Sequence, residues 1–179
     1  MKKLILSLFL ISMTAISIYG QAGTKLAVGV KAPDWMFLDA DSKEFTMKTW
    51  AGKVLQVNYV DPDEQDLNEP FNDAVKKALD VDKRISRELF KGIGIVDCKS
   101  TWKPDFLIRK IAGNKAKKFE TTILFDYKAI LQNLWGMPED NYTVVILDKN
   151  RVCRIIYKGK IPDSDVEKVI QQIILLTKE

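Results

Sequence analysis

The order of strand-like and helix-like segments is the feature that most constrains the fold of this chain. GKVLQVNYV, at residues 52–60, is almost continuously apolar, which is typical of a parallel strand covered on both faces. Residues 68–79 then form a predicted helix that Asn68 can cap, with Phe71, Val75 and Leu79 on one face. The pattern repeats, with strands predicted at residues 92–98 and 121–126 and helices at residues 104–119 and 128–135. Parallel strands joined by helices predict an α/β fold.

Hairpins and a helix complete the predicted architecture. YTVVIL and VCRIIY, at residues 142–147 and 152–157, are separated by a tight polar turn, which predicts an antiparallel hairpin. Ser164 and Glu167 have the spacing of a capping box at the start of a last helix. A short hairpin is predicted near the N-terminus, over residues 32–47. We therefore expect a sandwich with a central mixed sheet of about five strands flanked by helices.

The first twenty residues have the pattern of a secretory signal peptide. Lys2 and Lys3 precede an uncharged apolar run at residues 4–20, and small residues follow it. The run is shorter than the roughly 20 apolar residues that a bilayer span needs. We expect cleavage after Gly20 or Ala22, a periplasmic or secreted protein without a membrane anchor, and a single domain over residues 21–179.

Composition excludes several function classes. The chain has 28 basic and 24 acidic side chains, and without Lys2 and Lys3 the balance is 26 to 24, too even to predict nucleic acid as a partner. It has no histidine, which excludes Ser-His-Asp and Cys-His nucleophile systems and most zinc sites. Its two cysteines, Cys98 and Cys153, form no CxxC pair. No cofactor and no catalytic residue are predicted.

Two segments resemble the thioredoxin-like superfamily, in particular its peroxiredoxin and TlpA-like branch. Residues 29–60 contain a Gly-x-x-Ala-Pro lead, a hairpin and a Gly-Lys-Val strand, and residues 141–161 resemble the closing hairpin, with Leu-Asp-Lys at its turn. The chain is most similar to the YtfJ family of small exported thioredoxin-like proteins, whose members also lack the paired cysteines. The resemblance implies a thioredoxin-like sandwich.

The chain departs from the redox pattern of that superfamily at two positions. The turn after the first core strand, DPDEQDL at residues 61–67, is acidic and has no cysteine. Tyr142 stands where the superfamily carries a cis-proline, so we expect a trans bond before it. The two departures together predict a non-catalytic binding or accessory module of the cell envelope, with an envelope protein as its partner.

Two alternative functions remain open. Cys98 ends a parallel strand, where open α/β sheets place functional loops, and it could serve a single-cysteine redox protein or sensor. Asp61 and Asp63 have the alternating spacing of a calcium loop, which would make the domain calcium-stabilised. For Cys153 a role in core packing is favoured. We expect no disulfide between the two cysteines, because their strands are three positions apart in a thioredoxin-like sheet.

A binding surface is predicted around the altered turn. It would combine aromatic side chains, Trp135 among them, with the acidic turn and the thiol, while core packing is the favoured alternative for the two tryptophans. Its candidate residues are Asp61, Asp63, Cys98, Trp102 and Tyr142.

Overall fold

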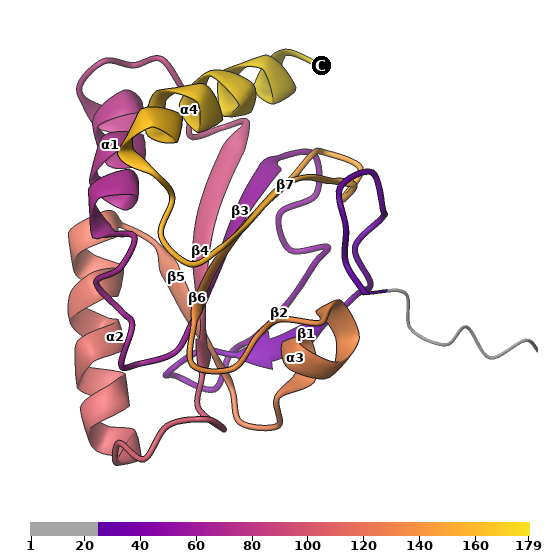
Figure 1. The fold of residues 1–179 in the computed structure, drawn as a ribbon. Helices are drawn as coiled ribbons and strands as arrows, with labels where there is room; N and C mark the ends of the chain where they lie inside the picture. Colours follow the sequence, from indigo (N-terminus) through magenta and orange to yellow (C-terminus); the bar gives the residue numbers. More distant parts are fainter. Residues whose placement is uncertain (1–24) are drawn as a thin grey trace, which may run out of the picture.

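A computed structural model of the chain describes residues 25–179 (Figure 1). The predicted signal peptide and its cleavage site lie outside the described residues. The elements are, in order, β1 (Met36–Leu38), β2 (Glu44–Thr46), β3 (Val54–Val60), α1 (Glu69–Asp80), β4 (Phe90–Asp97), α2 (Asp105–Phe119), β5 (Thr122–Asp126), α3 (Ile130–Trp135), β6 (Tyr142–Leu147), β7 (Cys153–Lys158) and α4 (Asp163–Lys178). No helix within residues 25–179 has the length and apolar character to span a bilayer.

All seven strands form one mixed sheet in the order β2-β1-β5-β4-β3-β6-β7. The central strands β3, β4 and β5 are parallel, whereas β6 runs antiparallel to β3 and continues into the hairpin with β7. The prediction of about five strands was too low. The N-terminal hairpin joins the sheet because Leu38 of β1 pairs with Phe125 of β5, a contact between segments far apart in the sequence.

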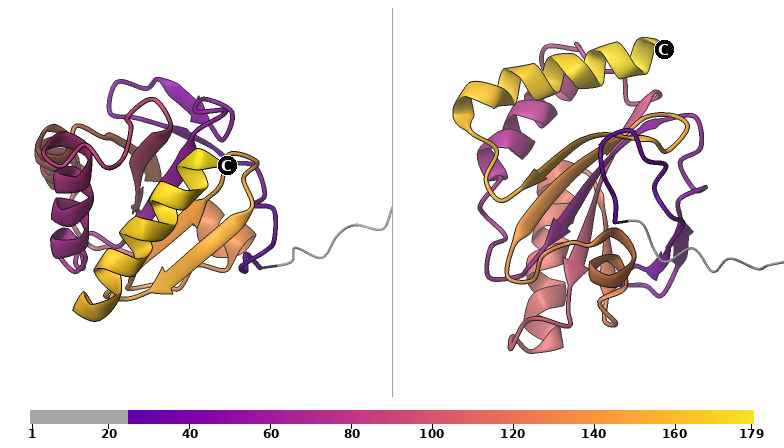
Figure 2. Two further views of the ribbon diagram at one scale, coloured as in Figure 1. Left: turned by 90° about the horizontal axis from the view of Figure 1, so that it is seen from above. Right: turned by 45° about the vertical axis from the view of Figure 1, so that its right-hand side comes forward.

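Helices cover the two faces of the sheet unequally. Helices α1, α2 and α4 lie on one face, and α3 lies with the N-terminal segment on the other (Figures 1 and 2). Along β3, Leu55, Val57 and Tyr59 contribute to the core on the α3 side. The alternate positions Gln56 and Asn58 face the α1 side, because side chains alternate along a strand.

Two predicted caps have other roles in the structure. Helix α4 begins at Asp163 after Pro162 without a side-chain cap, and Glu167 pairs with Arg84, so the capping-box prediction is wrong. Asn68 precedes α1 but makes no cap hydrogen bond. Its side chain instead donates to the carbonyl oxygen of Gly159 at 3.0 Å. In both cases the side chain that the local sequence pattern assigns to a helix end makes a tertiary contact instead.

Arg151 ties the turn of the closing hairpin to the segment before β3. It is 8% exposed, and its guanidinium donates to the carbonyl oxygens of Met47 at 3.1 Å and Lys53 at 2.7 Å. It also donates to the carbonyl oxygens of Trp50 and Asp148. One side chain therefore satisfies four backbone acceptors from two distant parts of the chain.

Candidate functional site

Three buried aspartates lie where the parallel strands end. Asp61 follows β3, Asp97 ends β4 and Asp126 ends β5, and their exposed fractions are 2%, 1% and 0%. Asp126 accepts hydrogen bonds from the backbone N–H groups of Ile130 at 2.9 Å and Leu131 at 3.0 Å. It thereby satisfies free N–H groups in the first turn of α3 and fixes that helix at the carboxyl edge of the sheet.

Tyr59 lies between two of these carboxylates on the α3 side of the sheet. Its hydroxyl donates to Oδ2 of Asp126 at 3.5 Å. Burial, and then the negative charges of Asp97 and Asp126, raise the pKa of Tyr59, so the phenol stays protonated. Asp97 accepts hydrogen bonds from the Lys99 N–H at 3.0 Å and from the side chain of Gln132. These groups are held in place by neighbouring backbone and amide groups.

Asp61 is the least satisfied of the three carboxylates. Its Oδ1 accepts a hydrogen bond from the Asp63 N–H at 2.7 Å, but its buried Oδ2 has no hydrogen-bond partner in the part of the chain that the structure describes. Burial, followed by the charges of Asp97 and Asp140, raises the pKa of Asp61 to about 6. This carboxyl group therefore changes its charge close to neutral pH, at the turn where the sequence resemblance places redox cysteines.

The loops after β3 and β4 are connected by a lysine. Lys103 forms an ion pair with Asp63, and its Nζ lies 5.9 Å from the centre of the Trp102 ring. Trp102 is 82% exposed and Phe106, in the first turn of α2, is 73% exposed. The structure thus brings the predicted residues Asp61, Asp63 and Trp102 to one edge, and it adds Phe106, which the sequence analysis missed.

The other predicted members of the binding surface are less accessible. Cys98 is half-buried, and Trp135 is fully buried, with its indole N–H donating to the Pro33 carbonyl at 3.0 Å. The bond before Tyr142 is trans, as predicted. The Tyr142 ring is 3% exposed and its hydroxyl accepts a hydrogen bond from Asn72 of α1 at 2.9 Å. Tyr142 and Trp135 therefore do not share a surface with Trp102.

Neither cysteine has the environment of a thiolate. Burial, and then the charges of Asp105, Asp97 and Asp126, raise the pKa of Cys98 to about 12. Cys153 is buried in β7, and burial raises its pKa to about 11. Both thiols are free, and their strands β4 and β7 are three positions apart in the sheet, as predicted.

The acidic turn does not assemble a metal site. Among residues 25–179, no group of three or more histidine, cysteine, aspartate or glutamate side chains is arranged to hold a metal ion. Asp63 is engaged with Lys103 instead. The geometry gives no support to the calcium interpretation of Asp61 and Asp63.

A cavity of about 400 Å³, which was not predicted from the sequence, lies between the sheet and helices α1 and α2. The side chains of Gln56 and Asn58 form part of its lining, together with the glycine positions of β4. A signal was present in the sequence, because two polar residues interrupt an otherwise apolar strand. Two glycines also stand at alternate positions of the next strand, Gly92 and Gly94.

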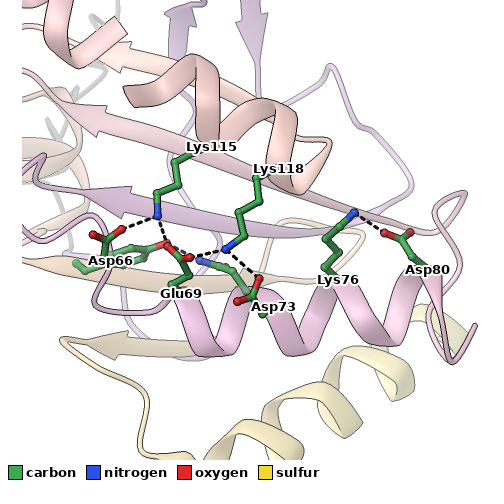
Figure 3. A network of polar contacts seen from close by, with 9 residues as sticks. Asp66, Glu69, Asp73, Lys76, Asp80, Lys115 and Lys118 are labelled. Atoms are coloured by element: carbon green, nitrogen blue, oxygen red, sulfur yellow. Dashed lines mark hydrogen bonds and ion pairs between the residues drawn. The ribbon is translucent and has the colours of Figure 1, made fainter. Parts of the chain in front are cut away.

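Ion pairs connect the two helices beside this cavity (Figure 3). Lys115 of α2 pairs with Asp66 at 2.6 Å and with Glu69, and Lys118 pairs with Glu69 and, at 3.4 Å, with Asp73. Hydrogen bonds from Lys115 and Lys118 lower the pKa of Glu69 to about 2. Charged contacts thus hold the first turn of α1 against the last turns of α2.

The family of the chain follows from its sequence. The family model described as "Bacterial protein of unknown function (YtfJ_HI0045)" matches residues 26–176, which is nearly all of the described chain. The chain belongs to this family. Over a segment of 64 residues, the chain is also 30% identical to an uncharacterised protein from Haemophilus influenzae. That match covers 36% of this chain and 35% of the relative, so the chain spans about a third of the relative's length.

Solved structures show that this YtfJ family member has the thioredoxin-like fold. A candidate protein disulfide isomerase from Bacteroides thetaiotaomicron is similar with a TM-score of 0.63 and 19% identity, covering 86% of this chain and 92% of that chain. The exposed lipoprotein thioredoxin Etrx1 from Streptococcus pneumoniae is similar with a TM-score of 0.58 and 14% identity. The match covers 79% of this chain and 98% of that chain.

A third similar structure comes from the peroxiredoxin side of the superfamily. The reduced 2-Cys peroxiredoxin of Plasmodium vivax has a TM-score of 0.58 and 15% identity, covering 85% of this chain and 99% of that chain. At such low identity these similarities establish the fold of the YtfJ member but not its chemistry.

Proposed function

We propose that this protein is an exported thioredoxin-fold protein that has lost dithiol chemistry and serves as a binding module of the cell envelope. The observation that carries the proposal is the identity of the group at the β3–α1 turn. Asp61 is buried there with a carboxylate oxygen that has no partner within residues 25–179, and neither cysteine of the chain lies on that turn. A carboxylate at this place cannot attack or form a disulfide.

The environment of Cys98 argues against replacement of the lost dithiol by a single thiol. Thiol–disulfide exchange needs the thiolate, and reactive cysteines have a pKa lowered by nearby positive charge. The three charges that raise the pKa of Cys98 after burial are all negative, and Arg109 opposes them only weakly. The thiol is therefore protonated at any physiological pH.

The carboxyl edge of the sheet is the surface that we assign to a partner protein. Exposed aromatic rings are favoured at interfaces because they bury a large area with few rotatable bonds. Trp102, in the loop before α2, and Phe106, in its first turn, are both more than 70% exposed, and Tyr127 is 45% exposed. Export is supported by the N-terminal sequence pattern and by similarity to the exposed lipoprotein Etrx1.

Reductase and peroxidase assays test the loss of chemistry. The purified protein should give no insulin reduction with dithiothreitol and no peroxide consumption above the uncatalysed rate, whereas a CxxC thioredoxin assayed in parallel turns over. Turnover that disappears in Cys98→Ser would establish the single-cysteine alternative instead.

Site-specific photocrosslinking tests the binding role. A photoreactive amino acid at Trp102, in protein expressed and exported in its native cells, should give one discrete crosslinked species of envelope origin. The control position is Leu175, which is 54% exposed on α4, and this helix lies at the opposite end of the fold from the start of α2 (Figure 1). Equal crosslinking from both positions, or none from Trp102, would remove this surface from the proposal.

A further inference from the structure

Two glycines of β4 make part of the floor of the α1–α2 cavity. Gly92 and Gly94 occupy alternate positions of this central strand, so both face the helices that cover it (Figure 1). In the interior of a strand glycine is less favourable than alanine, because it loses more conformational freedom on folding. Such a glycine often marks a place where a ligand approaches the backbone closely.

The local geometry does not require glycine at these two positions. Neither residue has a positive φ. A Cβ atom at Gly92 would meet only one atom within 4 Å, Cε1 of Phe90 at 3.9 Å. A Cβ atom at Gly94 would be in ordinary contact with Ile123, from 3.4 Å. The two glycines therefore leave a hollow that larger residues could fill.

The walls of the hollow are apolar. Val75 and Leu79 of α1 and Ile108 and Phe119 of α2 line its sides, and Ile123 of β5 adds to its floor. This lining suits the apolar body of a small molecule, since ligand pockets are mostly apolar with a few placed polar groups. The volume of about 400 Å³ lies within the usual range for such pockets.

Amide groups form the polar end of the cavity. The two amides of β3, Gln56 and Asn58, pair with the two glycines of β4 in the sheet. Nε2 of Gln56 donates to the side-chain oxygens of Asn58 at 3.2 Å and Asn72 at 2.9 Å. The Asn72 amide in turn donates to the Tyr142 hydroxyl at 2.9 Å. The nitrogen of Gln56 is therefore fully engaged with neighbouring side chains.

The oxygen of the same Gln56 amide has no such engagement. Gln56 is 2% exposed, and its Oε1 accepts no hydrogen bond from any residue in the range 25–179. A buried acceptor that is left unpaired costs free energy. A hydroxyl group of a ligand in the cavity would satisfy it, whereas an ionised carboxylate has no hydrogen to donate. The orphaned oxygen thus selects a ligand with a hydrogen-bond donor.

The charged side chains of the lining select a neutral ligand. Lys76, Arg87 and Lys115 are ion-paired, and so are the two glutamates that line the cavity. Lys53 donates to the Arg87 carbonyl oxygen at 2.9 Å, and Lys91 projects to the α3 face because side chains alternate along β4. The charges of the described lining are therefore already engaged or point away. A charged ligand would be buried without a partner, which costs free energy.

We infer that the cavity binds a small neutral alcohol, with its apolar body over Gly92 and Gly94 and its hydroxyl donating to Oε1 of Gln56. None of the three exposed aromatic residues assigned to a partner protein lines this cavity, so the inference goes beyond the proposed function. Octanol is the probe. Its isomer heptyl methyl ether has no hydrogen-bond donor, and octanoate replaces the hydroxyl end with a negative charge.

Calorimetric titration and thermal unfolding of the purified protein test this assignment. Octanol should bind at one saturable site and raise the unfolding temperature, since a ligand that binds only the native state stabilises it. Heptyl methyl ether should bind about tenfold more weakly, because it leaves Oε1 of Gln56 unpaired. Octanoate should also bind about tenfold more weakly, because its charge has no partner in the lining.

A variant without the amide tests the role assigned to Gln56. Gln56→Met removes the orphaned oxygen and keeps a side chain of similar length. The preference for octanol over heptyl methyl ether should then fall from about tenfold to less than about threefold, whereas a merely structural role would weaken both ligands equally.

Filling the hollow separates this site from any other apolar surface and does not depend on Gln56→Met being folded. Gly92→Val should keep or raise the unfolding temperature, because valine favours the strand, while the affinity for octanol falls about tenfold. If Gly92→Val does not fold, Gly92→Ala combined with Gly94→Ala adds two methyl groups for which the structure has room. Gly113→Ala is the control, because this exposed glycine of α2 is outside the lining of the cavity, and it should leave the affinity unchanged.

Three results would overturn the inference: no saturable octanol binding at millimolar concentration, equal affinities of the wild type for octanol and heptyl methyl ether, or wild-type affinity for octanol in the filled variants. None of these results would bear on the insulin, peroxide or Trp102 crosslinking experiments. Failure of the ligand assignment is therefore distinguishable from failure of the proposed function.

Discussion

Oδ1 of Asn68 accepts a hydrogen bond from the backbone N–H of Ile161 at 2.8 Å, across 93 residues of sequence. The same side chain donates from Nδ2 to the carbonyl oxygen of Gly159 at 3.0 Å. One amide thus uses its donor and its acceptor to hold the turn before α1 against the segment that joins β7 to α4. Asn68 is 1% exposed, so water cannot replace either bond.

Replacing Asn68 should destabilise the fold without altering its exposed surfaces. Asn68→Ala leaves a buried N–H and a buried carbonyl unpaired, and we expect a loss of about 2 kcal/mol in the free energy of unfolding, measured with urea. Asn68→Asp keeps the acceptor for Ile161 but loses the donor for Gly159, so it should also destabilise. Asn114→Ala, at an exposed position of α2, is the control and should change stability by less than about 0.5 kcal/mol.

The stability difference between the wild type and Asp61→Asn should depend on pH. The folded-state pKa of Asp61 is about 6, above its ordinary value of 3.8. The carboxyl group therefore contributes its full stability below about pH 4 and loses it as pH rises through 6. Asp61→Asn should be more stable than wild type by up to about 3 kcal/mol above pH 7, with no advantage near pH 4. Denaturant titrations between pH 4 and 8 measure this, and a constant advantage would contradict it.

Cys98 should react slowly with alkylating reagents. With a pKa of about 12, it carries far less thiolate at pH 8 than a free cysteine. In Cys153→Ala, iodoacetamide should modify the native protein much more slowly than the urea-unfolded protein, and the native rate should keep rising between pH 8 and 10. A native rate that levels off below pH 8 would show an activated thiol and would favour the single-cysteine function.

Arg151 should not tolerate a lysine. Its planar guanidinium reaches four carbonyl oxygens, three of them in the segment before β3, and an ammonium group cannot reproduce that geometry. Arg151→Lys and Arg151→Met should each lower the free energy of unfolding by about 3 kcal/mol. The matched control is Arg154→Met, which removes a surface pair with Glu179 and a longer pair with Asp148 at 3.7 Å, and it should cost less than about 1 kcal/mol.

The sequence predicted what depends on local pattern and on neighbouring strands. The apolar run before Asp61, the helix that begins beyond it and the closing hairpin lie within a few residues of their predicted places. The trans bond before Tyr142 was predictable because a non-proline cis bond is costly. The order that separates β4 from β7 followed from the superfamily resemblance.

Features that depend on distant contacts were not predictable. Pairing of Leu38 with Phe125 adds the N-terminal hairpin to the sheet, and no local signal distinguishes a free hairpin from an attached one. Trp102 and Trp135 have the same side chain, but only tertiary packing makes one exposed and the other buried. The cavity is not predictable from the interpretation of residues 52–60 as a strand covered on both faces, because that interpretation gives no role to Gln56 and Asn58, which line the cavity.

The position of β3 in the sheet determines when the protein can finish folding. Strand β3 pairs with β4 on one edge and with β6 on the other, and β6 is not complete until Leu147. A shortened or still-emerging chain that ends before β6 would therefore present an unpaired edge of a highly apolar central strand, which is a template for aggregation. The last third of the polypeptide thus completes the middle of the sheet. Productive folding has to wait until the chain is available as far as Leu147.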